Sequence, residues 1–214
     1  MTGALLKREV TYVVGAVIDA TGLAISPGNP KQLIAVRGRT YAESLVDIYL
    51  DAGIDTIAVV TGEHDYLLRK ALDNTTAVCL KNNGYEYSSF MESVRIGIQY
   101  LADRCDRIFV SPLETALTDE KTLLSMLSKH ADVVCSVRNG ADCSPYLLSD
   151  KAFRWCMLYN GRRGMEGAVR SLEKASSASF VRVEPEEVRD RTKEAGMRKS
   201  ALFIPAYRPV INWI

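Results

Sequence analysis

Cysteine pairs and histidines are scarce in this sequence. The five cysteines include no C-x-x-C pair, and the only two histidines are His64 and His130. An odd number of widely spaced cysteines predicts reduced thiols rather than a disulfide framework or a zinc site. Both histidines fall near the ends of predicted helices, where a solvated surface position is the simpler interpretation. We therefore expect no nucleophilic triad.

The chain also lacks an excess of charge and a long apolar run. Its 214 residues carry a formal net charge of only +1. The chain therefore has no excess of positive charge that would favour nucleic acid or an anionic membrane as a partner. No run reaches the length of a membrane span, and the first residues contain no apolar segment typical of a secretory signal. We expect a cytoplasmic protein that forms a single domain over residues 1–214.

A dinucleotide-binding fingerprint is absent as well. Gly15 lies inside the first predicted strand, and no G-x-G-x-x-G pattern follows it. Because that fingerprint needs its glycines in the turn after the strand, the sequence gives little support to a Rossmann dehydrogenase.

Apolar segments of two kinds alternate along the chain. Short continuous runs predict strands covered on both faces, and longer segments with apolar residues at helical spacing predict helices. The predicted strands cover residues 12–19, 56–61, 77–80, 107–110, 131–137, 144–148 and 180–184. The predicted helices cover residues 41–52, 65–72, 88–102, 119–129, 150–158 and 165–175. This alternation predicts an α/β fold with a mostly parallel sheet, whose ligand lies beyond the carboxyl ends of the strands.

The segment from Val17 to Lys31 joins the first predicted strand to the chain that follows. It contains Gly22, Gly28 and two prolines, and it ends in a lysine. Glycines let backbone N–H groups turn inward around an anion, and a lysine adds a point charge for a phosphate. A Gly/Pro-rich loop after a strand is also common where the loop only connects two elements of secondary structure. The residues alone leave open both a phosphate-binding loop and a structural turn.

This segment resembles the signature loop L-A-A-G-x-S-x-R-M-G-x-x-K of nucleotidyltransferases of the molybdenum-cofactor type, the MobA-like NTP transferase family. With Lys31 on the family lysine, Gly22 and Gly28 fall on family glycines and Ala20-Thr21 on the Ala-Ala pair, without a gap. The resemblance implies that this loop binds the nucleotide through Ala20, Thr21, Gly22, Gly28 and Lys31.

A second resemblance covers the run N-N-G-Y-E-Y-S-S-F-M-E-S-V-R-I-G from Asn82 to Gly97. Asn82 falls on the family asparagine near the base, and Ser93 falls on a family serine. The resemblance implies that both bind the nucleotide, and a helix N-terminus favours phosphate. The residues alone leave a second interpretation, in which Ser88 or Ser89 caps the helix and Ser93 faces solvent.

The segment from Arg107 onward resembles the family strand that ends in D-x-P, whose aspartate holds magnesium. Glu114 stands on the aspartate and Ala116 on the proline. The resemblance implies Glu114 as the metal ligand, Mg²⁺ as the cofactor, and Lys31 and Glu114 as the catalytic residues. A glutamate delivers its oxygens one methylene farther out than an aspartate does. A solvent-exposed acid in a turn is the alternative interpretation of Glu114.

The resemblance implies a fold and a reaction. The fold is a three-layer α/β/α arrangement with a Rossmann-like sheet of the nucleotide-diphospho-sugar transferase (GT-A) type. The reaction transfers CMP or GMP from CTP or GTP to a phosphorylated acceptor such as molybdopterin. Ser26 stands where the family has an arginine, and Arg191 stands at an acidic position. The alternative is therefore a catalytically degenerate homologue that binds a nucleotide or a protein partner without transfer.

Overall fold

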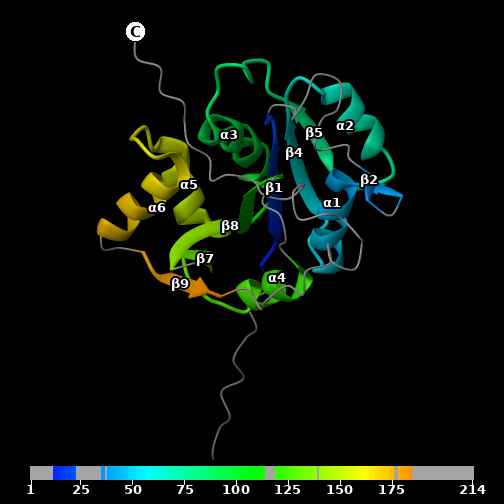
Figure 1. Ribbon diagram of the computed structural model, residues 1–214. Helices are drawn as coiled ribbons and strands as arrows, with labels where there is room; N and C mark the ends of the chain where they lie inside the picture. Colours follow the sequence, from blue (N-terminus) through cyan, green and yellow to red (C-terminus); the bar gives the residue numbers. More distant parts are fainter. Residues whose placement is uncertain are drawn as a thin grey trace, which may run out of the picture.

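The protein folds around one seven-stranded sheet flanked by helices (Figure 1). The computed structural model describes residues 12–22, 35–36, 38–113, 119–138, 140–175 and 178–184. The strands are β1 Val14–Ala20, β2 Ala35–Val36, β3 Arg39–Thr40, β4 Thr56–Thr61, β5 Val78–Lys81, β6 Arg107–Pro112, β7 Val133–Arg138, β8 Ala141–Ser149 and β9 Phe180–Val183. The helices are α1 Tyr41–Asp51, α2 Asp65–Ala71, α3 Phe90–Leu101, α4 Glu120–Leu127, α5 Asp150–Leu158 and α6 Gly164–Lys174.

All seven predicted strands and all six predicted helices are present, with ends that differ by a few residues. The largest difference is β8, which begins at Ala141 rather than at residue 144 because it pairs with β7 in a hairpin from its first residue. The short antiparallel ribbon of β2 and β3 was not predicted. None of the helices in the described part of the chain is long and apolar enough to cross a membrane.

The strand order in the sheet is β5-β4-β1-β6-β8-β7-β9. Every neighbouring pair is parallel except those that β8 makes with β6 and β7, so the predicted mostly parallel α/β sheet is confirmed. From β1 the chain proceeds to β4 and β5 on one side, and it then crosses to β6 on the other. The order therefore reverses between β1 and β6, the position where open α/β sheets bind ligands.

Two apolar clusters make the predicted three-layer α/β/α arrangement. One face of the sheet is covered by α1, α2 and α4, and the other face by α3, α5 and α6. Side chains of β1 alternate between these faces: Ala16 and Ile18 point to the first cluster, and Val17 to the second. A central strand buried on both sides must be apolar at successive positions, as the sequence of β1 is.

Pro145 lies in the interior of β8 without breaking the sheet. The pairing register shifts here, since Cys135 pairs with Tyr146 whereas Ser136 pairs with Cys143. Two residues of β8 therefore have no partner at this irregularity. A proline cannot donate to the ladder, and a bulge is a position where that donor is not needed.

Helix α3 lies very close to β1 because position 97 has no side chain. A Cβ built on Gly97 would lie 2.3 Å and 2.7 Å from the two Cγ atoms of Val17. Val17 is fully buried (0% exposed), and a β-branched side chain has little rotamer freedom to move aside. Gly97 thus fixes the distance between the helix and the central strand.

We predict that Gly97→Ala destabilises the protein by about 2 kcal/mol. Alanine gains about 1 kcal/mol in helix propensity. Overpacking against Val17 costs about 3 kcal/mol, the upper part of the usual range, because that side chain cannot yield. The measurement is urea unfolding, followed by circular dichroism.

Gly84→Ala is the matched control, because a Cβ there meets only Asn82 Oδ1 at an ordinary 3.6 Å. Adding Val17→Ala to Gly97→Ala should restore part of the lost stability. A Gly97→Ala protein as stable as the wild type would show that α3 does not depend on this close approach.

Candidate functional site

Segments that follow four parallel strands meet at the carboxyl edge of the sheet. The strands end at Ala20, Thr61, Lys81 and Pro112. Gly62 lies where three of these segments touch. A Cβ on Gly62 would lie 3.2 Å from the carbonyl oxygen of Thr21 and 3.1 Å from Cβ of Tyr85. A larger residue at position 62 would therefore push the segments after β1 and β5 apart.

A chain of hydrogen bonds links β1 to the first turns of α3. The Thr21 hydroxyl donates to Asp19 Oδ1 at 2.7 Å, and the Thr21 N–H donates to the same oxygen at 3.1 Å. The hydroxyl oxygens of Thr21 and Ser93 are 3.2 Å apart. Because the Asp19 carboxylate accepts the Thr21 proton, the Ser93 hydroxyl must donate to Thr21. Ser93 is 0% exposed, so this chain joins the helix to the strand inside the protein.

Asn82 extends the network into the turn after β5. Its side-chain amide donates to the Ser88 hydroxyl at 2.7 Å and to Ser93 Oγ at 3.4 Å, and its Oδ1 accepts from the Gly84 N–H at 2.9 Å. Its own N–H donates to the Thr61 carbonyl at 2.8 Å. Asn82 is only 6% exposed. A buried amide with this set of partners fixes the path of the turn.

Ser89 caps α3 at this edge. Its hydroxyl accepts from the Glu92 N–H at 3.4 Å, and the Glu92 carboxylate accepts from the Ser89 N–H at 2.5 Å. The hydrogen bond from the Ser89 backbone lowers the pKa of Glu92. The interpretation that Ser89 caps the helix is confirmed. The interpretation that Ser93 faces solvent is wrong, because Ser93 turns toward Thr21 in the interior.

The structure brings four of the predicted nucleotide-binding residues together. Ala20 ends β1 and Thr21 follows it, while Asn82 and Ser93 belong to the network described above. Gly22 comes next and is exposed. The side chains of Thr21, Asn82 and Ser93 bind one another or neighbouring groups, so they form one polar network at the carboxyl edge. Their contact with a nucleotide stays a prediction.

The predicted catalytic residues fall outside the described part of the chain. Residues outside it include Ser26, Gly28, Lys31, Glu114 and Arg191. Strand β6 leads toward Glu114 and ends at Pro112. The N–H of the next residue, Leu113, donates to the Asp19 carbonyl at 2.7 Å. Residue 113 therefore lies at the β1–β6 switch point, and Glu114 is the next residue in the sequence.

Asp19 and Gly62 take part in this edge but were not among the predicted site residues. Both had a signal in the sequence. Asp19 is an acid at the end of an otherwise apolar strand, and Gly62 directly follows the strand T-I-A-V-V-T. An acid at such a position needs donors nearby, which Thr21 supplies.

Asp19 is the carboxylate in the described part of this edge that could hold a divalent metal ion. Among the described residues, no group of three or more His, Cys, Asp or Glu side chains lies close enough to hold a metal. Asp19 provides one carboxylate at the switch point, and its Oδ1 already accepts from Thr21. Magnesium is commonly held by one or two carboxylates together with substrate phosphates, and Asp19 could supply one of these oxygens.

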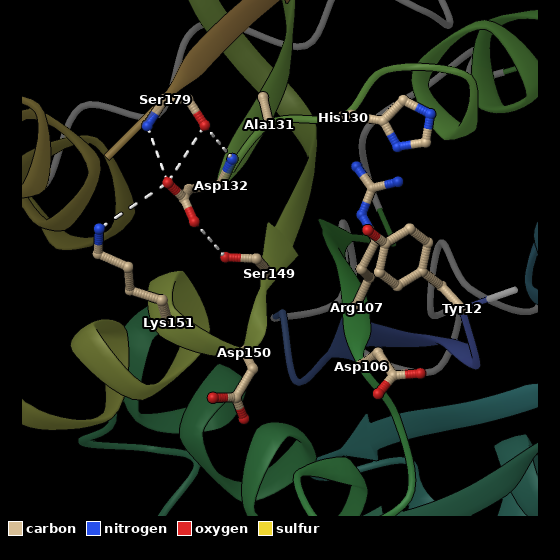
Figure 2. A pocket seen from close by; sticks show the side chains of 10 residues that line it. All are labelled: Tyr12, Asp106, Arg107, His130, Ala131, Asp132, Ser149, Asp150, Lys151 and Ser179. Carbon is tan, nitrogen blue, oxygen red and sulfur yellow. Dashed lines mark hydrogen bonds and ion pairs between the residues drawn. The ribbon is translucent and has the colours of Figure 1, made fainter. Parts of the chain in front are cut away.

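A pocket of about 510 Å³ lies at the opposite, amino edge of the sheet. Figure 2 shows Asp132 on one side of the pocket, where its carboxylate accepts from the Ser149 hydroxyl at 3.0 Å and from the Ser179 N–H at 2.8 Å. Asp132 thereby joins the start of β7 to the end of β8 and the start of β9. Its hydrogen bonds hold three strands together.

Arg107 lines the same pocket and also has a structural role. Its guanidinium donates to the carbonyls of Leu127 at 3.3 Å and Lys129 at 2.9 Å, which lie at and just after the end of α4. Burial lowers the pKa of Arg107. Figure 2 shows its guanidinium between Tyr12 and the exposed His130. The main polar groups of this pocket serve the fold, so we place the candidate site at the carboxyl edge.

Comparison with protein families gives one match over most of the chain. Residues 16–197 match the model of the MobA-like NTP transferase domain. This range contains β1 from Ala16 onward and every later strand and helix of the described fold. No curated protein sequence matches the chain.

Solved structures show the same fold at low sequence identity. A nucleotidyl transferase from Methanothermobacter thermautotroptrophicus has a TM-score of 0.69 and 19% identity, covering 82% of this chain and 88% of that one. A manganese complex of Rv0371C from Mycobacterium tuberculosis has a TM-score of 0.61 and 19% identity, covering 82% and 89%. The 4-diphosphocytidyl-2C-methyl-D-erythritol synthase from Anaerococcus prevotii has a TM-score of 0.62 and 14% identity, covering 81% and 87%.

We predict that Ser93→Ala destabilises the protein by about 1–2 kcal/mol. The change removes a buried hydroxyl and leaves Thr21 and Asn82 with one partner fewer. Combined with Thr21→Val in a double-mutant cycle, it should show a coupling energy of about 0.5–2 kcal/mol, because the two hydroxyls belong to one network. Chemical unfolding of the four proteins measures both quantities.

The control is Ser125→Ala on α4, whose hydroxyl has no hydrogen-bond partner among the described residues. It should change stability by less than about 0.5 kcal/mol. A coupling energy of zero between positions 21 and 93 would contradict the hydrogen-bond chain.

Proposed function

Because the chain belongs to the MobA-like NTP transferase family, we propose that it transfers CMP or GMP from CTP or GTP to a phosphorylated small molecule such as molybdopterin. The observation that carries this proposal is the convergence at the β1–β6 switch point. There the family-matched loop after Ala20 and the segment after Leu113 leave adjacent strands at one edge. Nucleotide ligands commonly occupy such a position in open α/β sheets.

We assign the triphosphate to the loop that follows β1. Gly22 and Gly28 let its backbone approach the phosphates closely, and Lys31 contributes a positive charge to them. Thr21, held by Asp19 and Ser93, sets the direction in which the loop leaves the strand. Its role is to position the loop.

We assign the turn after β5 to the base. Asn82 fixes this turn through the hydrogen bonds to Gly84 and Ser88. Gly62 lies against both Tyr85 in this turn and the Thr21 carbonyl, so the turn and the start of the loop after β1 are neighbours. A rigid turn that exposes backbone groups can select a base by hydrogen bonds to its edge, which favours one nucleotide over the others.

The transfer needs positioning and charge neutralisation more than covalent chemistry by the protein. An oxygen of the acceptor phosphate forms a bond to the α-phosphorus, the bond from that phosphorus to the bridging oxygen breaks, and pyrophosphate leaves with both electrons of that bond. Lys31 would offset the charge on the phosphates throughout. Glu114 and Asp19 would hold Mg²⁺, which supplies further neutralisation when bound.

A second candidate function is binding without transfer. Ser26 replaces a family arginine, so the loop carries one cation fewer, and Asp19 places an acid at the start of the same loop. Arg191 stands at an acidic position, where a guanidinium cannot ligate a metal. These substitutions favour a degenerate homologue that binds a nucleotide or a protein partner.

We predict that Lys31→Ala weakens binding of CTP or GTP by about 1.5–3 kcal/mol, the range for a lost charge-assisted contact. Isothermal titration with Mg²⁺ present measures the dissociation constant. Lys129→Ala, which lies just after α4 at the amino edge, should leave it unchanged. An unchanged dissociation constant in Lys31→Ala would remove this lysine from the nucleotide site.

Pyrophosphate release separates the two candidate functions. We expect it from CTP or GTP, with Mg²⁺ and molybdopterin, if the protein is a transferase. If wild-type protein releases none, Ser26→Arg combined with Glu114→Asp should raise nucleotide affinity at least tenfold, or about 1.4 kcal/mol, and either change alone should do less. Failure of this double variant to bind any nucleotide would leave a partner-binding role.

A further inference from the structure

The pocket at the amino edge of the sheet carries opposite charges on its two sides. Figure 2 shows Arg107 and His130 on one side, next to the ring of Tyr12, and Asp132 on the other. Asp106 and Asp150 also line the pocket. A volume of about 510 Å³ is sufficient for a small organic molecule.

Arg107 has hydrogen-bond donors that the fold does not use. A guanidinium carries five N–H donors, and two of them bind the carbonyls of Leu127 and Lys129. In the described part of the chain, the other three have no hydrogen-bond partner, and the charge has no carboxylate partner. Arg107 is only 4% exposed. Because a buried charge without a counter-ion is costly, an anionic group bound in the pocket would stabilise it.

Tyr12 and His130 add two further polar groups on the same side. The Arg107 Cζ lies 5.6 Å from the centre of the Tyr12 ring, and the rings of Tyr12 and His130 are 6.2 Å apart. Among the residues that the structure describes, neither the Tyr12 hydroxyl nor the His130 imidazole has a hydrogen-bond partner. A hydroxyl and an imidazole N–H beside a guanidinium are donors that suit a carboxylate.

The acids of the pocket differ in how far their charge is neutralised. Asp132 pairs with Lys151 at 3.9 Å, and Asp150 pairs with Arg154 at 2.7 Å. The Oδ2 atom of Asp106 accepts a single backbone N–H at 2.8 Å, and its Oδ1 has no partner in the described part of the chain. Asp106 is therefore the carboxylate of this pocket that a ligand can still neutralise.

Asp106 and Arg107 are successive residues, yet no ion pair joins them. Arg107 begins β6, and Asp106 precedes it. Successive side chains of an extended chain point in opposite directions, so the two charged groups are held apart. Both line the pocket. One end of a strand thus presents a positive and a negative group that remain separately available.

We infer that this pocket binds a small zwitterion of the amino-acid class. The carboxylate of the ligand accepts from Arg107, Tyr12 and His130, and its ammonium group donates to Asp106. A ligand with a negative charge alone meets the acids, and one with a positive charge alone meets the guanidinium. The site lies at the edge opposite the nucleotide site, so it does not depend on the transferase function proposed above.

A series of unbranched ω-amino acids, from glycine to 6-aminohexanoate, tests this requirement for two charges. Binding to the full chain is measured by isothermal titration and by the rise in Tm with ligand concentration. We expect one member to bind at least tenfold more tightly than the carboxylate and the amine of the same chain length, each of which carries one charge. The assignment fails if no member binds, or if a singly charged analogue binds equally well.

Asp106→Asn removes the negative charge and keeps an oxygen that can accept the backbone N–H. This variant should bind the best ω-amino acid at least fivefold more weakly, and it should bind the matching carboxylate more tightly than the wild type does. A merely structural Asp106 would not reverse this preference. Asp103→Asn, an exposed acid after α3 that does not line the pocket, is the matched control and should bind as the wild type does.

Tyr12→Phe and His130→Ala test the other side without disturbing a hydrogen bond of the described fold. Each should weaken binding of the ω-amino acid at least threefold, whereas Tyr87→Phe, in an exposed turn at the other edge, should not. Wild-type affinity in both variants would overturn the assignment. Saturating CTP or GTP should leave the affinity unchanged, and displacement by either nucleotide would place the zwitterion at the carboxyl edge and refute the site.

Discussion

The close contact between α3 and β1 determines the geometry of the candidate site. Gly97 allows the helix to approach Val17 at a distance that no other residue would permit. Four residues earlier on the same helix, Ser93 reaches Thr21 across the gap between helix and strand. A wider helix–strand distance would separate these hydroxyls and release the start of the loop after β1. The packing of one glycine thus fixes the polar network that sets the direction of the loop.

That network shows how buried polar groups are accommodated at the carboxyl edge. The proton of each hydroxyl has an acceptor, ending at the Asp19 carboxylate, which can only accept. The series of hydrogen bonds begins at Asn82, whose side-chain amide donates to both Ser88 and Ser93. The Asn82 side-chain oxygen accepts from the Gly84 N–H and so fixes the turn that follows. Because a half-satisfied buried network costs more than an apolar core, these residues act as one rigid unit.

The two edges of the sheet differ in how they use charge. At the amino edge, Arg107 and Asp132 bind backbone and hydroxyl groups of neighbouring elements, so their charges stabilise the fold. At the carboxyl edge, the charged group is the Asp19 carboxylate, which accepts from the N–H and the hydroxyl of Thr21. The first loop has serine at position 26, where the family has arginine.

The sequence by itself determined the elements, the mostly parallel sheet and the family. The apolar runs of a doubly covered sheet and the spacing on one face of each helix are local patterns, so strands such as Thr56–Thr61 and helices such as Asp150–Leu158 could be read without coordinates. The glycines of the first loop and the run from Asn82 to Gly97 are also contiguous in sequence. Motifs of this kind were sufficient to identify the transferase family.

Only the tertiary structure decided which side chains face one another. Whether Ser93 turns to solvent or to Thr21 depends on how closely α3 packs on β1, over 72 residues of sequence separation. Arg163, which precedes α6, has a left-handed backbone with φ +73°, and no local preference of arginine predicts it. Tertiary contacts impose this conformation, because the Tyr159 hydroxyl donates to the Arg162 carbonyl at 2.7 Å and Gly167 leaves room for that carbonyl. A residue's own propensity acts over a few neighbours, whereas hydrogen-bond polarity, burial and imposed strain arise from elements that meet only when the chain is folded.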